Sequence, residues 1–157
     1  MATVYDAQGT KAYLVATTVS TVDIAAIETA ISSGKEFKFL PDGFGDIGST
    51  RNVQTYTFID VDDAVKSLGS IQLGTITADM MFNAADTGAQ EELRTMYLDK
   101  TRRKMIVVLP DEGTTNPSYL VLQVACSGIN IGIQKDNALM AKSQIEIDSI
   151  PVLFKAA

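Results

Sequence analysis

The chain is organised around one strand-like stretch, Ser70-Ile-Gln-Leu-Gly-Thr-Ile-Thr-Ala-Asp-Met-Met-Phe82. Apolar and polar residues alternate along it with the period of two that is typical of a half-buried β-strand. The phase slips once between Leu73 and Ile76, so the apolar residues before and after this point fall on opposite faces. One extra residue near Gly74 would bring them back to a single face, and we therefore expect a β-bulge there.

An amphipathic helix is expected directly after this strand. Asp86 is a good N-cap residue, since its carboxylate can accept hydrogen bonds from the free amides of the first turn. Four apolar residues then recur at helical spacing and form one stripe: Ala89, Leu93, Met96 and Tyr97. The next apolar strand, Met105–Leu109, is stopped by Pro110. We expect a helix at about residues 87–99 that docks on the sheet through Leu93.

Length and composition set the outer limits. The chain has 157 residues, of which 46% are hydrophobic and 20% are charged, and this suits one folded domain spanning residues 1–157. The formal net charge is −6. Because affinity for phosphate comes mainly from clustered Lys and Arg, this acidity argues against a protein that binds nucleic acid through a basic surface. It leaves open a surface that must avoid sticking to DNA.

Targeting and redox signals are absent from the sequence. No stretch approaches the ~20 apolar residues that a membrane-spanning helix needs, and the first residues lack the pattern of a secretory signal. The single cysteine, Cys126, cannot form an intrachain disulfide, which fits folding in a reducing cytoplasm. We interpret Cys126 as a small core residue rather than a nucleophile, since no base is available to activate it.

Catalytic and metal-binding patterns are also weak. The sequence contains no histidine, which removes Ser-His and Cys-His pairs and imidazole metal sites. The run Asp60–Asp63 lacks the central glycine and distal glutamate of a calcium loop, so a solvated acidic turn is favoured. Glu146 with Asp148 is the only candidate pair of catalytic carboxylates, and it is better interpreted as the polar face of a strand. We expect no enzyme activity, no catalytic residue, no bound metal and no cofactor.

Most of the remaining chain has the pattern of β-strands. They are expected at Lys11–Val19, Asn52–Ile59, Tyr119–Ser127, Ala138–Ile147 and Ile150–Phe154. Residues 24–33 fit either a helix or a strand. Asp23 could cap a helix and Gly34 could end it, but isoleucine and threonine serve both states.

Two loops and one basic cluster are candidates for contacts between subunits. The loop Pro41–Arg51 is rich in glycine yet holds an apolar pair, and such a pair docks either on its own core or on a partner. The basic run Lys100–Lys104 has no interleaved aromatic residues, so a solvated or intersubunit cluster is favoured over a DNA patch. An adjacent subunit's acidic loop, Asp60–Gly69, could meet it. The candidate contact residues are Phe44, Ile47, Arg51, Asp60, Asp62, Asp63, Lys100, Arg102, Arg103 and Lys104.

The order of these parts resembles the tail tube (major tail) protein of long-tailed, non-contractile bacteriophages. The likeness is carried by Leu68-Gly-Ser-Ile-Gln-Leu-Gly-Thr-Ile76, Met80-Met-Phe-Asn83, Asp86-Thr-Gly-Ala-Gln-Glu-Glu-Leu93 and Leu109-Pro-Asp111. Most of it lies between Leu68 and Gly113. Strand spacing extends the likeness from about Asn52 to the end of the chain, and the first fifty residues match only loosely.

The resemblance implies a mainly β fold, a two-sheet β-sandwich or barrel-like domain with one flanking α-helix. It implies a structural virion protein of the tail tube, made in the host cytoplasm, whose copies form stacked hexameric rings with strands joined edge to edge around a channel. DNA would pass through this channel without specific binding. The implied partners are further copies and other tail proteins (tape measure, tail terminator and distal tail protein), and no membrane. One long loop, here Pro41–Arg51 or Asp60–Gly69, would order only between rings.

Other classes stay open beside this family. A tube protein of a contractile tail or of a type VI-like secretion apparatus shares the architecture, and the sequence separates it poorly. A small-ligand-binding β-barrel has a similar length and strand number, although here a helix interrupts the middle of the chain.

Overall fold

The computed structural model describes residues 10–38, 44–57, 59, 64–85, 87–109, 117–133 and 139–155. Within these ranges the chain is mainly β-structure with two helices, which confirms the expected fold class and adds one helix to it. In chain order the elements are β1 (Lys11–Ala16), α1 (Ile24–Ser33), β2 (Lys35–Glu36), β3 (Ser49–Thr57), β4 (Ala64–Leu73), β5 (Thr75–Met81), α2 (Ala89–Asp99), β6 (Arg102–Leu109), β7 (Ser118–Gly132), β8 (Met140–Ile147) and β9 (Val152–Phe154).

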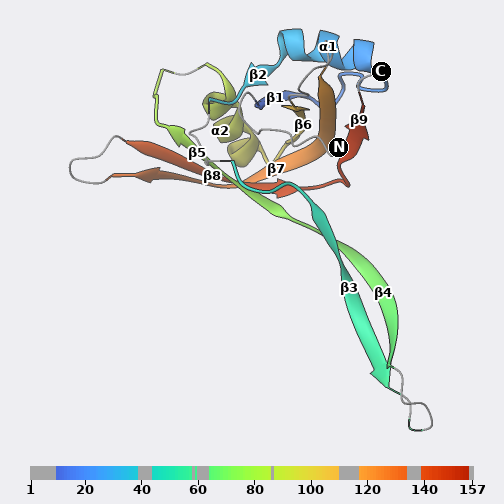
Figure 1. Ribbon diagram of the computed structural model, residues 1–157. Coiled ribbons are helices and arrows are strands. Elements are labelled where there is room, and N and C mark those ends of the chain that lie inside the picture. Colours follow the sequence, from blue (N-terminus) through green and yellow to red (C-terminus); the bar gives the residue numbers. More distant parts are fainter. Residues whose placement is uncertain are drawn as a thin grey trace, which may run out of the picture.

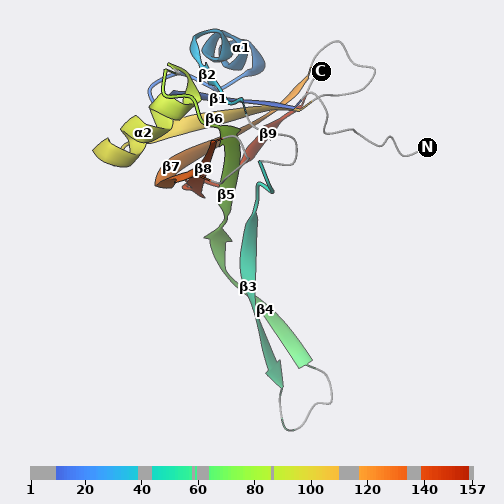
Figure 2. The same ribbon diagram turned by 90° about the vertical axis from the view of Figure 1, so that its left-hand side faces the viewer.

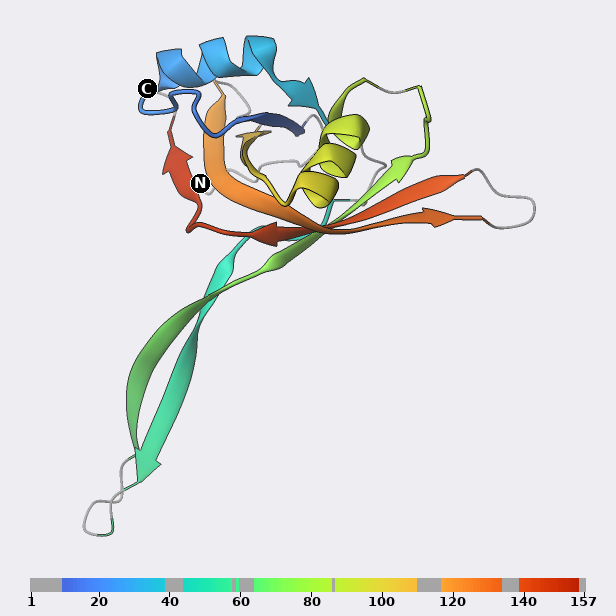
Figure 3. The ribbon, with the colours of Figure 1, turned by 180° about the vertical axis from the view of Figure 1, so that it is seen from behind.

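The main sheet is antiparallel, with strand order β2-β1-β6-β7-β8-β5 and with β9 paired to β7. It curls into a half-barrel whose hollow side holds α2, whereas α1 lies against the outer side (Figures 1 and 3). Each of the central strands therefore buries side chains on both faces. Neither described helix is long and apolar enough to cross a bilayer.

Two apolar clusters hold the sheet between its helices. On the hollow side, Leu93 and Met96 of α2 pack with alternate residues of β1, β5, β6, β7 and β8, such as Met105 and Leu122. On the outer side, α1 packs with strand residues that alternate with those of the first cluster, such as Ile106 of β6. This alternation follows from the pleat, which points successive side chains to opposite faces.

Residues 24–33 form a helix, which settles the choice that the sequence left open. The Asp23 carboxylate accepts a hydrogen bond from the Ala26 N–H at 2.7 Å, and the Gly34 N–H donates to the Ile31 carbonyl at 3.0 Å. Both predicted end signals are confirmed. A Cβ at Gly34 would lie 3.1 Å from Val15 Cγ1, so the small residue also lets the helix end pack tightly against β1.

Helix α2 lies close to its expected position but differs at two residues. It begins at Ala89 with Gly88 as its N-cap, so the prediction of Asp86 as N-cap is wrong, and Asp86 lies outside the described residues. Leu93 is fully buried as expected, whereas Tyr97 is 50% exposed. Tyr97 lies two turns beyond the buried Gln90 on the same side of the helix, where the sheet no longer covers it.

The expected bulge at Gly74 is wrong, because the chain changes its hydrogen-bonding edge there. The Gly74 N–H donates to the Gly48 carbonyl at 3.2 Å, while its C=O accepts from the Ile147 N–H at 3.0 Å. Regular strand residues direct both groups to the same side. The phase slip in the sequence therefore marks the point where β4, paired with β3, becomes β5, paired with β8.

A bulge does occur earlier in the same stretch. The pairing of β3 with β4 shifts register between Arg51 and Val53, where Asn52 faces two residues of β4, Gly69 and Ser70. A Cβ at Gly69 would lie 3.2 Å from the Asn52 carbonyl oxygen. The glycine thus permits the close approach that the bulge requires.

Strands β3 and β4 form a separate two-stranded ribbon, which we call the β3–β4 ribbon. It projects from the curled sheet as a long arm (Figures 1 and 2). Residues 49–51 and 64–69, expected as parts of two loops, are strand because they belong to this ribbon. The expectation of loops there is wrong, and residues 41–43 and 60–63 lie outside the described residues.

Candidate functional site

The β3–β4 ribbon exposes apolar side chains on both of its faces. Val53 lies directly opposite Leu68, and Tyr56 lies opposite Val65. All four side chains are at least half exposed. An isolated two-stranded ribbon is marginally stable in water, and exposed apolar pairs of this kind mark surfaces that bind a partner. The ribbon is therefore the strongest candidate for an interaction surface in the described part of the chain.

The basic run lies mostly within strand β6, which begins at Arg102 rather than at Met105 as expected. Two of its cations are used inside the chain. Arg103 Nε lies 2.6 Å from Glu92 Oε1 of α2, and Lys104 Nζ donates to the Val19 carbonyl at 2.8 Å. Both cations therefore connect β6 to neighbouring elements of the same chain. That they also contact another subunit stays a prediction.

The other two cations of the run are more accessible. Arg102 Nε lies 2.6 Å from Asp148 Oδ2, but its side chain is 54% exposed, and an exposed ion pair of this kind contributes little to stability. Lys100 is the C-cap of α2 in the left-handed conformation, with φ of 56°. No carboxylate among the described residues forms an ion pair with Lys100.

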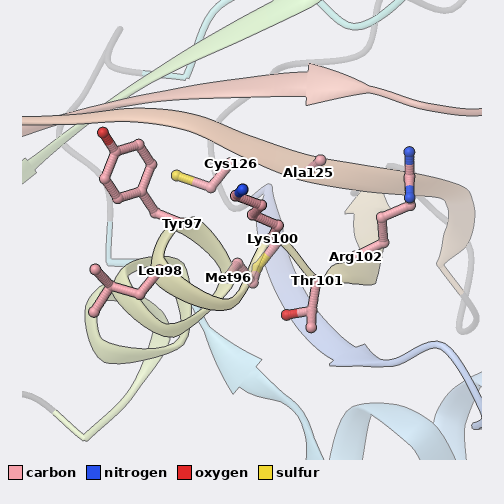
Figure 4. Close-up of a pocket in the computed structure, with 8 residues that line it drawn as sticks. All are labelled: Met96, Tyr97, Leu98, Lys100, Thr101, Arg102, Ala125 and Cys126. Carbon is pink, nitrogen blue, oxygen red and sulfur yellow. The ribbon is translucent and has the colours of Figure 1, made fainter.

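A groove of about 520 Å³ opens between the end of α2 and strands β6 and β7, and we call it the α2–β7 groove. Its lining residues are Met96, Tyr97, Leu98, Lys100, Thr101, Arg102, Ala125 and Cys126. Figure 4 shows Tyr97, Lys100 and Cys126 gathered around one side of it, with Arg102 beyond Ala125. Cys126 is half-buried at the edge of the core, and burial raises the pKa of its thiol. Among the described residues, the lining combines apolar surface with two cations and no carboxylate.

The remaining candidate contact residues fall into three groups. Phe44 is 9% exposed and packs edge to face on Phe37, with ring centroids 6.0 Å apart, while Ile47 packs on the same cluster. The apolar pair thus docks on its own core, one of the two alternatives. Arg51 donates to the Gly69 carbonyl across the ribbon at 3.3 Å. The third group of candidates, the aspartates of the Asp60–Asp63 run, lies outside the described residues.

The comparisons with known proteins concern the fold. No protein-family model matches the chain, and no curated protein matches it in sequence. A chain of the six-fold symmetrised anti-feeding prophage baseplate is similar with a TM-score of 0.72 and 7% identity, over 98% of this chain and 97% of that one. A chain of the sheath/tube terminator of PVC, an extracellular contractile injection system, has a TM-score of 0.67 and 8% identity, over 98% and 99%. The SPP1 tail tube protein is similar with a TM-score of 0.64 and 10% identity, and the match covers 98% of this chain and 80% of that one.

The chain has the tail-tube fold. At identities this low the likeness concerns the fold alone, yet it extends over nearly the whole chain, including the ribbon. The tail-tube fold thus includes the described residues of the first fifty, where the sequence patterns matched only loosely.

The tail-tube fold here has one strongly polar sheet surface, on the outer side of β5, β8 and the end of β7. Glu146 accepts hydrogen bonds from Thr75 Oγ1 at 2.7 Å and from Ser127 Oγ at 3.1 Å. Lys142 lies opposite Asp79 in the strand register. The interpretation of Glu146 as part of a polar face is confirmed, since the residues between it and its neighbours on β8 are buried. Asp148, the other member of the candidate carboxylate pair, lies beyond the end of β8 and forms an ion pair with Arg102.

One residue of the tail-tube fold that sequence patterns missed is Gln90, a buried polar side chain on α2. Its Nε2 donates to the Met81 carbonyl at 2.6 Å, and its Oε1 accepts from the Asn83 N–H at 3.1 Å. Along β5 the backbone groups of successive residues point alternately to the two edges of the strand. Those of the even-numbered residues, such as the Gly74 C=O and the Phe82 N–H, bond towards β8. The Met81 C=O and the Asn83 N–H therefore point to the opposite edge of β5, which pairs with no strand among the described residues. Gln90 therefore substitutes for a neighbouring strand at this end of the sheet.

Gln90→Leu is expected to lower the free energy of unfolding by about 1–3 kcal/mol, because it leaves two backbone groups without partners. Urea unfolding of dilute protein, followed by circular dichroism, measures the change. Gln144→Leu is the matched control, since Gln144 is exposed on β8. A Gln90 variant as stable as this control would show that water replaces the lost hydrogen bonds.

Proposed function

We propose that this chain is the repeating subunit of a virion tail tube, with residues 1–157 forming one tail-tube domain. Copies would assemble into stacked hexameric rings, and the channel of the stack would carry DNA into the host. The observation that carries this proposal is the exposed β3–β4 ribbon on a body with the tail-tube fold. Such a ribbon gains apolar contacts only when it meets another molecule.

The polar surface of β5 and β8 suits the wall of the proposed channel. Its one lysine, Lys142, faces Asp79 across the strand pair, and Glu146 lies on the same surface. A surface that carries carboxylates beside its cation has little net positive potential, and it attracts phosphate weakly. DNA would therefore slide along this wall without being held.

The partners and location follow from the same role. Further copies of the chain would be the main partner, and the tape measure, tail terminator and distal tail proteins would join the ends of the tube. The protein would be made in the host cytoplasm and end in the virion tail, with no membrane partner and no catalytic activity.

A tube subunit of a contractile apparatus is the second candidate function. Two of the three similar structures described above come from the anti-feeding prophage and from an extracellular contractile injection system. A ligand-binding barrel is less suitable, because α2 fills the hollow of the half-barrel with Leu93 and Met96.

Purified protein is expected to form rings or long hollow tubes as its concentration rises, while dilute samples stay monomeric. Electron microscopy across a concentration series checks this directly, and the symmetry of the rings tests the hexamer. A monodisperse monomer at millimolar concentration would overturn the proposed function. Addition of the sheath protein of a contractile system, if one is encoded nearby, would separate the two candidate tubes, since only a contractile tube should bind it.

A further inference from the structure

We propose that the outer end of the β7–β8 hairpin of one copy packs on the end of α2 in a neighbouring copy, over the α2–β7 groove. This inference rests on the proposed function, because it needs copies that assemble. It joins an apolar sheet face that no helix covers to a helix end that has no sheet beneath it.

The sheet face at the outer end of the hairpin is apolar and uncovered. Ile131 lies opposite Ala141, which belongs to the cluster beneath α2. Because side chains alternate between the two faces, Ile133 and Leu139, two residues further out on either side of the hairpin, continue this face. Ile131, Ile133 and Leu139 are 48%, 80% and 44% exposed. We call these three residues the hairpin platform, and Figures 1 and 3 show the hairpin extending past α2.

The hairpin platform and the α2–β7 groove lie at opposite ends of α2. A small cavity of about 90 Å³ is lined by Gln90 and Arg94, from the first half of α2, and by Ile129 and Ile131 of β7. The inner edge of the platform is therefore next to the start of the helix, whereas the groove opens at its end. The 11 residues of α2 span about 16 Å.

This separation makes the contact one between copies. The platform and the groove of one chain are held apart by a packed helix, so they cannot meet each other. Each copy offers one platform and one groove to its neighbours. Such a head-to-tail pattern generates closed rings or open helical arrays.

The end of α2 offers apolar surface that matches the platform. Tyr97 and Leu98 are 50% and 74% exposed, and Cys126 is half-buried beside them in the lining of the groove. The groove has a volume of about 520 Å³, which exceeds that of a single isoleucine side chain. Docking would remove apolar side chains of both copies from water.

The charges at the two ends of α2 are complementary. Glu91 lies at the start of the helix beside the platform, and Lys100 lies in the groove at its end. Neither forms an ion pair with another described residue. The same holds for Arg94 at the start and Asp99 at the end. A head-to-tail contact can therefore bring each of these charges close to an opposite charge of the neighbouring copy.

The native cysteine in the groove gives a direct test. Ile133→Cys adds a thiol to the platform, and a short bifunctional thiol reagent should join it to Cys126 of a neighbouring copy in assembled protein. Within one chain the two positions lie about 23 Å apart along one extended segment, so a short reagent cannot join them. Each chain then has two linking positions, and we expect a ladder of covalent oligomers that ends at the number of subunits in a closed ring.

Control variants separate this result from other cross-links. Ile133→Cys with Cys126→Ala should give dimers at most, and Val22→Cys, which replaces another exposed apolar residue of the body, should give no ladder. Peptide mapping should find residues 133 and 126 joined, and circular dichroism confirms folding. Assembled particles without this link would overturn the docking and leave the tube proposal standing. A protein that forms no particles would overturn both.

Charge reversal tests the electrostatic part of the contact. Lys100→Glu should raise the concentration needed for assembly by roughly two- to fivefold, the range for an exposed ion pair, and Glu91→Lys should do the same. The two changes combined should restore assembly, because they exchange the charges of the pair. Lys11→Glu, on β1, is the control with the same change of net charge as Lys100→Glu. A combined variant weaker than either single variant would contradict the pairing.

Discussion

Leu93→Ala is expected to lower the free energy of unfolding of the monomer by about 2–5 kcal/mol. Leu93 is 0% exposed and lies in the cluster that joins α2 to the hollow side of the sheet. Removing its isobutyl group leaves a cavity beneath the helix, which the surrounding strands cannot close without distorting their pairing. The loss is large relative to the total stability of a domain of this size.

The helix supplies its own control for this measurement. Leu98→Ala removes the same atoms from the same helix, but Leu98 is 74% exposed, so its effect should remain within about 0.5 kcal/mol. Urea unfolding at concentrations below assembly compares the two variants. Equal midpoints would mean that α2 does not pack on the sheet through Leu93.

Val53→Thr combined with Leu68→Thr is expected to raise the concentration needed for assembly by about a hundredfold while leaving the body folded. The two residues form an exposed cross-strand pair on the ribbon. Threonine keeps the strand preference of the ribbon but removes apolar surface worth about 3 kcal/mol when buried against a partner. Light scattering against protein concentration measures assembly, and circular dichroism confirms folding.

Val22→Thr is the control for this variant, because Val22 is 78% exposed on the body rather than on the ribbon. It should assemble like the parent protein. Assembly of the ribbon variant at the parent's concentration would remove this face of the ribbon from the contact between subunits.

The central part of the fold follows from sequence patterns because its signals are local. The stripe of α2 and the alternation of β8 both report which side chains face the core, and periodicity encodes that directly. Asp23 and Gly34 could likewise be assigned, since a cap acts within four residues of itself.

Other features depend on pairing that periodicity does not encode. The break in the apolar–polar alternation near Gly74 showed that the apolar side chains change face. It did not show that the chain stops pairing with β3 and begins to pair with β8 at this point. The loop-like composition around Gly69 concealed a ribbon, because each strand of it is stabilised by the other rather than by a core. Lys104 and Val19 are 85 residues apart in sequence, so the internal use of the basic run could not be seen from its composition.

The change of edge at Gly74 also bears on the mechanics of any assembly built from this chain. The backbone enters the ribbon after Gly48 and leaves it at Gly74, where one hydrogen bond is made on each side of the crossing. A rotation of about 10° at these two points would move the end of an arm of about 30 Å by about 5 Å. Contacts made at the end of such an arm can be kept while neighbouring bodies tilt. A tube of these subunits would therefore bend by adjusting its joints, with little elastic cost to the bodies themselves.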